Sequence, residues 1–209
     1  MRIDTHIHLY DPADNLRWPQ SGSSLYKKVS ASDFLHVGKN HNITKAVVVE
    51  CATEAEINLR MLQTLEEEEA VLAVIAFIDV KKSDFTRIYD QYTQYSKFRG
   101  LRYRYNSSEG VTDEVRKNVN YMSGKKANIV ELHGRYQDLS QLYELVSENP
   151  GVQFIVEHNG CIVIDGSEVP EAYIKFLNDM SLFENVCMKL SAIICLSKEV
   201  PAPTELSYY

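Results

Sequence analysis

The chain has 209 residues, of which 44% are hydrophobic and 24% are charged, so it is long enough to bury a sizeable core. Its net charge is −7, and no block rich in lysine and arginine stands out. This charge balance argues against nucleic acid and against an electrostatic membrane anchor as partners.

The N-terminal residues do not predict a secretory signal, because Asp4, His6 and His8 interrupt the apolar run that a signal needs. The longest strongly apolar run, residues 70–78, is far too short for a membrane span. The four cysteines form no close pair and no CxxC motif. These features favour reduced thiols and a cytoplasmic protein.

Seven short apolar segments alternate with helical patterns along the chain. Most are nearly continuous in hydrophobicity, which is typical of parallel strands buried on both faces. We expect strands at residues 2–9, 45–52, 71–80, 99–105, 127–133, 152–158 and 185–192.

Amphipathic or polar helical patterns fill the intervals between these segments. We expect helices near residues 30–42, 54–68, 83–95, 112–122, 138–149 and 170–183. Ser30 or Ser32 is expected to cap the first helix, and Pro170 to lie just inside the start of the last one. The glutamates at 66–69 are expected to form a solvated helix end.

The alternation predicts a single α/β domain over residues 1–209, with an atypical tail from about residue 194. A (β/α)8 barrel and an open doubly wound sheet both fit this pattern. No glycine-rich phosphate loop follows the first strand, which favours the barrel.

His6 and His8 lie two residues apart near the carboxyl end of the first expected strand. Side chains at such spacing point to the same face of a strand, and barrel enzymes place their chemistry at this end. Two imidazoles on one face can share a divalent metal. A hydrogen-bonded core role for either histidine remains the alternative.

Other polar residues fall at the ends of later strands. His133 and His158 close the fifth and sixth strands, and Arg102 and Arg104 share a face at the end of the fourth. The arginines could form ordinary ion pairs or grip a substrate carboxylate or hydroxyl cluster. For Lys189, in the seventh strand, an internal salt bridge is the simpler interpretation.

Several segments together resemble the amidohydrolase-related family of metal-dependent barrel hydrolases. They are, in chain order, "RIDTHIHLYDP", "AVVVECATEAE", "VLAVIAFIDV", "FRGLRYRY", "VQFIVEHNGCIVIDG" and "NVCMKLSAI". The set spans residues 2 to about 193 and is most similar to the branch of sugar-lactone hydrolases that contains L-fuconolactonase. The resemblance implies a TIM-barrel fold and hydrolysis of a sugar lactone or related cyclic ester.

The resemblance also implies roles for particular residues. His6, His8 and His158 match positions that bind metal and take part in catalysis, and Arg102 or Arg104 matches a position that contacts substrate. His133 is also assigned to substrate, and it would suit the metal-binding histidine that the wider superfamily carries on its fifth strand. The implied cofactor is a divalent metal, Zn²⁺ or Mn²⁺, and members of this branch can function without one. The implied partner is a small molecule, a sugar lactone or an organic acid.

The chain departs from the family pattern at two places. After the sixth strand the chain reads "EHNG", where the family typically has Asp-His-x-Gly. The next segment, "CIVIDG", replaces the lysine-proline stretch that is more usual in the family. No aspartate follows Asp179, whereas the family carries its general base on an eighth strand. We therefore expect a barrel that lacks the eighth strand and its helix, and weak or absent turnover.

Two alternatives to the lactonase stay open. One is a metal-dependent decarboxylase of the related amidohydrolase branch. The other is a non-catalytic barrel that binds a sugar acid or a paralogue. Strand edges without a neighbour favour pairing with a second copy, so a homo-oligomer is a further expectation.

Overall fold

The computed structural model describes residues 2–14, 16 and 18–198. The chain divides into two compact units. The first runs up to Arg102 and also includes Lys125–Ile129, and the second comprises Tyr103–Gly124 and the residues from Val130 onward.

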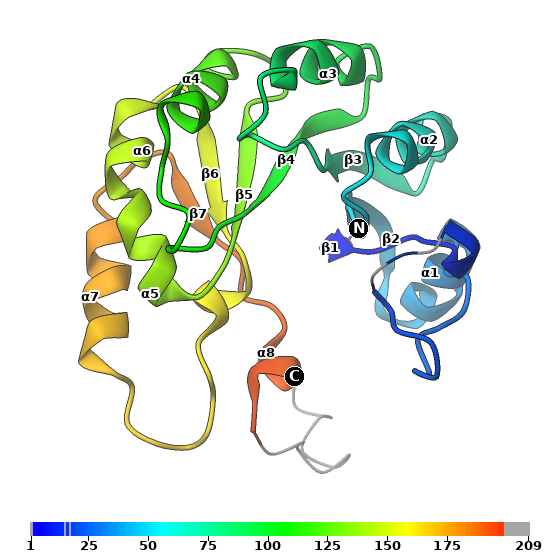
Figure 1. Ribbon diagram of the computed structural model, residues 1–209. Helices are drawn as coiled ribbons and strands as arrows, with labels where there is room; N and C mark the ends of the chain where they lie inside the picture. Colours follow the sequence, from blue (N-terminus) through cyan, green and yellow to red (C-terminus); the bar gives the residue numbers. More distant parts are fainter. Residues whose placement is uncertain (1, 15, 17, 199–209) are drawn as a thin grey trace. The chain divides into compact units, whose positions relative to one another are not determined.

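Seven strands are described, and their order in the sheet follows the chain from β1 to β7 (Figure 1). The strands are β1 (Arg2–Ile7), β2 (Ile43–Val49), β3 (Val71–Ala76), β4 (Phe98–Arg104), β5 (Ile129–His133), β6 (Gln153–Val156) and β7 (Val186–Met188). Parallel pairing joins β1 to β2, β2 to β3, β3 to β4 and β6 to β7. Parallel strands taken in chain order are the pattern of a (β/α)-barrel through its seventh strand, so the predicted fold class is confirmed.

Helices connect the strands, as parallel pairing requires. They are α1 (Ala31–Gly38), α2 (Ala55–Leu65), α3 (Phe85–Tyr92), α4 (Asp113–Tyr121), α5 (Tyr136–Leu139), α6 (Tyr143–Glu148), α7 (Glu171–Met180) and α8 (Ile193–Leu196). Short 3₁₀ turns are η1 (Pro12–Asp14), η2 (Lys39–His41), η3 (Ser140–Leu142) and η4 (His158–Cys161). None of the described helices is long and apolar enough to cross a membrane.

The core of the first unit lies between its strands and their helices. Fully buried side chains from strands and helices meet there: Val48, Val74, Ile75, Phe98, Leu62, Phe85 and Tyr89. Gly100 of β4 lies against the backbone of β5. A Cβ at this position would be 2.0 Å from the carbonyl oxygen of Ile129. The close approach of these two strands therefore requires glycine.

The second unit has its own buried apolar core. Strands contribute Leu132, Phe154 and Val156, and helices contribute Val119, Leu139, Leu145 and Phe176. Tyr105 and the part of β5 from Val130 onward belong to this unit, and the Tyr105 N–H donates to the carbonyl of His133 over 2.9 Å. This bond fixes the carboxyl end of β5, where His133 lies.

The predicted elements differ from the observed ones mainly at their ends. Several strands are shorter at their carboxyl ends than predicted, because polar residues there turn out of the sheet: β1 ends at Ile7, and β6 ends at Val156. Ser30 caps α1 through a capping box with Asp33, as expected. Pro170 is the N-cap of α7 and not its first helical residue, and the helix expected at 138–149 is broken into α5, η3 and α6.

Candidate metal centre

Three possible metal ligands gather at the carboxyl ends of β5 and β6 in the second unit. They are His133, the last residue of β5, and Glu157 and His158, which follow β6 directly. Each offers one ligand atom, and these atoms all lie within 4.8 Å of one another. Two imidazoles and a carboxylate at this separation form a donor set suited to a zinc-type ion.

Glu157 is the buried anchor of this group. It is fully inaccessible to solvent, and its Oε2 lies 2.9 Å from Nδ1 of His133. An ionised carboxylate only accepts, so Nδ1 of His133 carries the proton and Nε2 carries the lone pair. A carboxylate that orients a histidine in this way is the usual support of a metal ligand.

His158 is placed by an unusual left-handed turn. His158, Asn159, Gly160 and Cys161 have φ values of 51°, 54°, 63° and 49°. Such a conformation costs roughly 1–2 kcal/mol for each residue that is not glycine. The sequence "EHNG" provides one glycine and one asparagine, the two residue types that tolerate it best.

The segment after β7 holds this turn in place. The Asn159 N–H donates to the carbonyl of Lys189 over 3.1 Å, and the Asn159 side-chain amide donates to the carbonyl of Ser191, also over 3.1 Å. The Ser191 hydroxyl lies 2.8 Å from Nδ1 of His158. As a result the ring of His158 lies beside that of His133, with 6.0 Å between their centroids.

A buried ion pair lies in the same unit. Lys189 Nζ is 2.5 Å from Oε1 of Glu131, and both side chains are almost inaccessible. The pKa of Glu131 is raised to about 8, chiefly by burial and also by a hydrogen bond with Glu157, while the charge of Lys189 opposes the shift. The salt bridge expected for Lys189 is therefore present, and it offsets the charge of a carboxylate close to Glu157.

In the first unit, His6 and His8 lie close together as their spacing predicts. Their ring centroids are 5.1 Å apart and their planes are nearly perpendicular. Nδ1 of His8 lies 2.9 Å from the carbonyl oxygen of Val49 on β2, so this nitrogen donates and Nε2 carries the lone pair. The indole of Trp18 packs against the His8 ring at 5.5 Å, a contact that the sequence did not predict.

The two arginines of β4 differ in their surroundings. Arg102 is buried, and its Nη1 lies 3.8 Å from Oε1 of the buried Glu50, so its charge has an internal partner. Arg104, the last residue of β4, is exposed. Of the two, Arg104 is therefore the better placed to meet a ligand from solvent.

The residues predicted from the sequence are divided between the two units. His158 lies in the second unit with His133, which the sequence analysis assigned to substrate, and His6 and His8 lie in the first unit with Arg102. Glu157 and Glu131 were not predicted as site residues. One feature of the sequence could have pointed to Glu157 as a site residue. It lies immediately before His158, where an apolar strand ends in two polar residues.

The sequence matches a model of the amidohydrolase family over residues 3–205. An uncharacterized protein, y4mH, from Sinorhizobium fredii is 26% identical over 216 residues, which cover 91% of this chain and 72% of that protein.

Solved structures share the fold. An amidohydrolase from Burkholderia multivorans with bound zinc superimposes with a TM-score of 0.82 at 14% identity, covering 100% of this chain and 76% of that one. A probable 2-pyrone-4,6-dicarboxylic acid hydrolase from Acinetobacter baumannii, with citric acid bound, superimposes with a TM-score of 0.73 at 21% identity, covering 98% and 74%.

Proposed function

Because this chain belongs to the amidohydrolase family, we propose that it hydrolyses a lactone or related cyclic ester at a metal centre held by His133, Glu157 and His158. The observation that carries the proposal is the close grouping of these three side chains, with ligand atoms within 4.8 Å of one another. They lie at the carboxyl ends of strands, where barrel enzymes place their chemistry.

The residues fit a divalent metal such as Zn²⁺ or Mn²⁺. Imidazole nitrogen and carboxylate oxygen are ligands that both ions accept. The hydrogen bond between Glu157 and Nδ1 of His133 leaves the Nε2 lone pair as the donor that a metal would use. The bound zinc of the Burkholderia multivorans relative supports the same choice of metal.

In ester hydrolysis, the metal and the residues around it would have different roles. A bound metal would polarise the ester carbonyl and lower the pKa of a coordinated water. Glu157 fixes the tautomer and orientation of His133, and Ser191 holds the ring of His158. Lys189 offsets the negative charge of Glu131, so that the group around the metal does not accumulate uncompensated carboxylates.

For the substrate we propose a cyclic ester that carries a carboxylate, with neutral sugar lactones as the second class. Arg104 supports the first choice, because its exposed guanidinium at the end of β4 suits a carboxylate. The Acinetobacter baumannii relative, named as a probable hydrolase of a pyrone dicarboxylic acid, supports it as well. His6 and His8 are proposed as metal-binding or substrate-contacting residues of the first unit, on the resemblance and on their paired geometry.

The first test is zinc stoichiometry, measured on the purified chain by elemental analysis after reloading the stripped protein. We expect about one zinc per chain, lost in His133→Asn and in His158→Asn. The control is His36→Asn, which changes an exposed histidine of α1. A folded chain that binds no zinc, or a His133→Asn variant that retains it, would contradict the metal centre.

Activity is tested next, by pH-stat titration of acid released from 2-pyrone-4,6-dicarboxylate and from sugar lactones. We expect weak turnover, because no aspartate follows Asp179 to act as the family's general base. This turnover should depend on zinc and fall in Arg104→Gln through a higher KM for the dicarboxylate. Acid release from neither class would refute the substrate proposal. Release of carbon dioxide from an unsaturated acid would assign the chain to the decarboxylase branch instead.

A further inference from the structure

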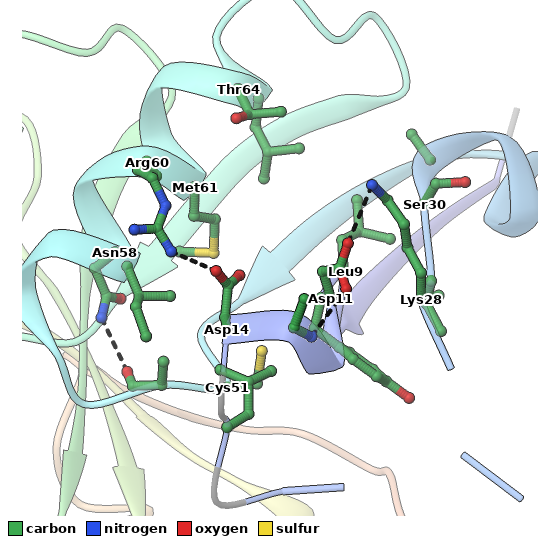
Figure 2. A pocket seen from close by; sticks show the side chains of 18 of the residues that line it. Leu9, Asp11, Asp14, Lys28, Ser30, Cys51, Asn58, Arg60, Met61 and Thr64 are labelled. Carbon is green, nitrogen blue, oxygen red and sulfur yellow. Dashed lines mark hydrogen bonds and ion pairs between the residues drawn. The ribbon is translucent and has the colours of Figure 1, made fainter. Parts of the chain in front are cut away.

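A cavity of about 440 Å³ lies in the first unit, along one face of α2. Its walls come from the segment after β1, the start of α1, the segment after β2, and α2 (Figure 2). The residues outside α2 are Leu9, Tyr10, Asp11, Ala13, Asp14, Leu16, Lys28, Val29, Ser30, Ala31, Cys51, Ala52 and Glu68. Neither His6 nor His8 lines it. The cavity is therefore separate from the histidine pair of this unit, and we refer to it as the α2 pocket.

The interior of the α2 pocket is apolar. Ile57, Met61 and Leu65 form a stripe at four-residue spacing along α2, and Leu9 and Val29 belong to the other walls. Ile57, Met61, Leu9 and Val29 are only half-buried. Leu62, the neighbour of Met61, is 1% exposed and belongs to the core. The stripe thus offers apolar surface beyond what the core of the unit uses.

Four of the five charged side chains that line the pocket form two ion pairs, and the fifth, Glu68, accepts from the N–H of Ala70 over 3.2 Å. Lys28 Nζ lies 3.3 Å from Oδ2 of Asp11, and Arg60 on α2 pairs with Asp14 on η1, as Figure 2 shows. The N–H of Ala13 and the ammonium of Lys28 lower the pKa of Asp11, so this carboxylate stays ionised. An ionic ligand would have to displace one of these partners or enter an apolar interior as a bare charge.

We propose that the α2 pocket is a binding site for a small, uncharged and mainly apolar molecule. Its volume falls in the range of sites that hold such ligands, about 300–1,000 Å³. Met61 can adapt its unbranched side chain to the shape of the guest. The Cys51 thiol and the Thr64 hydroxyl are among the uncharged polar groups on the walls that can orient it.

Two fluorescent probes with the same ring system test the charge selectivity. N-phenyl-1-naphthylamine is neutral, and 8-anilino-1-naphthalenesulfonate adds a sulfonate. We expect saturable binding of the neutral probe by the folded chain and binding of the sulfonate at least about tenfold weaker, because an anion resists entering an apolar interior. Equal affinity for the two probes, or no binding of the neutral one, would overturn the proposal.

Cysteine alkylation locates the binding site on the unaltered chain. Cys51 lines the pocket, whereas Cys187 is an exposed cysteine of β7 in the other unit. Saturating neutral probe should slow the reaction of Cys51 with iodoacetamide severalfold and leave the rate at Cys187 unchanged, as read by peptide mass spectrometry. Bound probe that leaves Cys51 as reactive as before would place the ligand elsewhere and refute the site.

A pair of α2 variants gives an independent readout. Met61→Trp places a large side chain in the cavity and should abolish binding of the neutral probe. Gln63→Trp adds the same side chain at an exposed position of α2 outside the pocket and should leave binding unchanged. Retained binding in Met61→Trp, or its loss in Gln63→Trp, would contradict the α2 pocket as the site.

Discussion

The carboxylate of Glu157 is buried beside His133, so its charge acts on that ring at short range. Glu157→Gln keeps the shape of the side chain and removes this charge. Glu157 is proposed both as a ligand and as the partner that orients His133. Because outer-shell partners alone typically contribute about 10–100-fold, we expect zinc affinity to fall by at least that factor. The measurement is competition against a chelator, with far-UV circular dichroism to verify the fold.

Glu171→Gln provides the control for this experiment. Glu171 is an exposed glutamate in the first turn of α7, in the same unit. Its replacement should leave zinc affinity unchanged. If Glu157→Gln binds zinc as tightly as Glu171→Gln does, Glu157 has no part in the metal centre.

The ion pair between Lys189 and Glu131 is the other interaction that acts at the scale of single residues. At alkaline pH, where Glu131 is ionised, Lys189→Met leaves this carboxylate buried without its cation, which we expect to lower the free energy of unfolding by about 3–5 kcal/mol. Burial raises the pKa of Glu131, so the acid form is favoured in the folded chain, and the loss should shrink as the pH falls below about 8. Urea denaturation at several pH values measures both effects.

The double variant Glu131→Gln/Lys189→Met separates the cost of an orphaned charge from the value of the pair. With both charges removed, most of the stability lost in Lys189→Met should return. A double variant as unstable as Lys189→Met would show that packing of the lysine stem, and not charge, accounts for the loss.

At the scale of elements, the left-handed turn η4 depends on Asn159. Its side-chain amide bonds to Ser191, and its φ of 54° disfavours most other side chains. Asn159→Ala loses the bond and keeps the steric cost, so we expect it to lower the free energy of unfolding by about 2 kcal/mol. Asn159→Gly also loses the bond but relieves the steric cost, and should be destabilised less.

Urea denaturation of the two Asn159 variants checks this order. The informative result is the difference between them, since both lose the same hydrogen bond. If Asn159→Gly is the less stable of the two, backbone conformation does not limit the turn, and chain entropy dominates instead. The zinc affinity of both variants, compared with that of the unaltered chain, then shows how strongly metal binding depends on the turn that positions His158.

At the scale of the whole molecule, exposed apolar side chains predict self-association. Leu190, Ile193 and Ile194 are exposed within one short segment after β7, which is the last strand in the sheet order. Apolar clusters beside an end strand are common sites of association. We expect sedimentation velocity to show mass rising with protein concentration, and Leu190→Lys/Ile194→Lys to suppress the rise.

The matched control for this prediction is Leu182→Lys. Leu182 is 80% exposed and Leu190 is 82% exposed, but Leu182 follows α7 and lies outside the 190–194 segment. Leu182→Lys should associate as the unaltered chain does. Equal suppression by both changes would indicate a general effect of added charge.

The sequence by itself determined the fold class and the number of strands in the part of the chain that the structure describes. Continuous apolar runs separated by amphipathic helices permit few arrangements other than parallel strands with helical crossovers, so all seven strands were predicted. The pairing of His6 with His8 was predictable for the same local reason, because spacing along one strand fixes which side chains share a face. Strand ends were less predictable, since polar residues there fit both a strand and the loop after it.

Only the tertiary structure decided which polar residues meet. Glu157 joins His133 because β5 and the segment after β6 lie side by side, and His158 turns toward them through a left-handed conformation that no propensity predicts. Arg102 looked equivalent to Arg104 in sequence, but the buried Glu50 on a neighbouring segment of the first unit gives it an internal partner. Such contacts join residues far apart in the chain, so local patterns along the sequence carry no information about them.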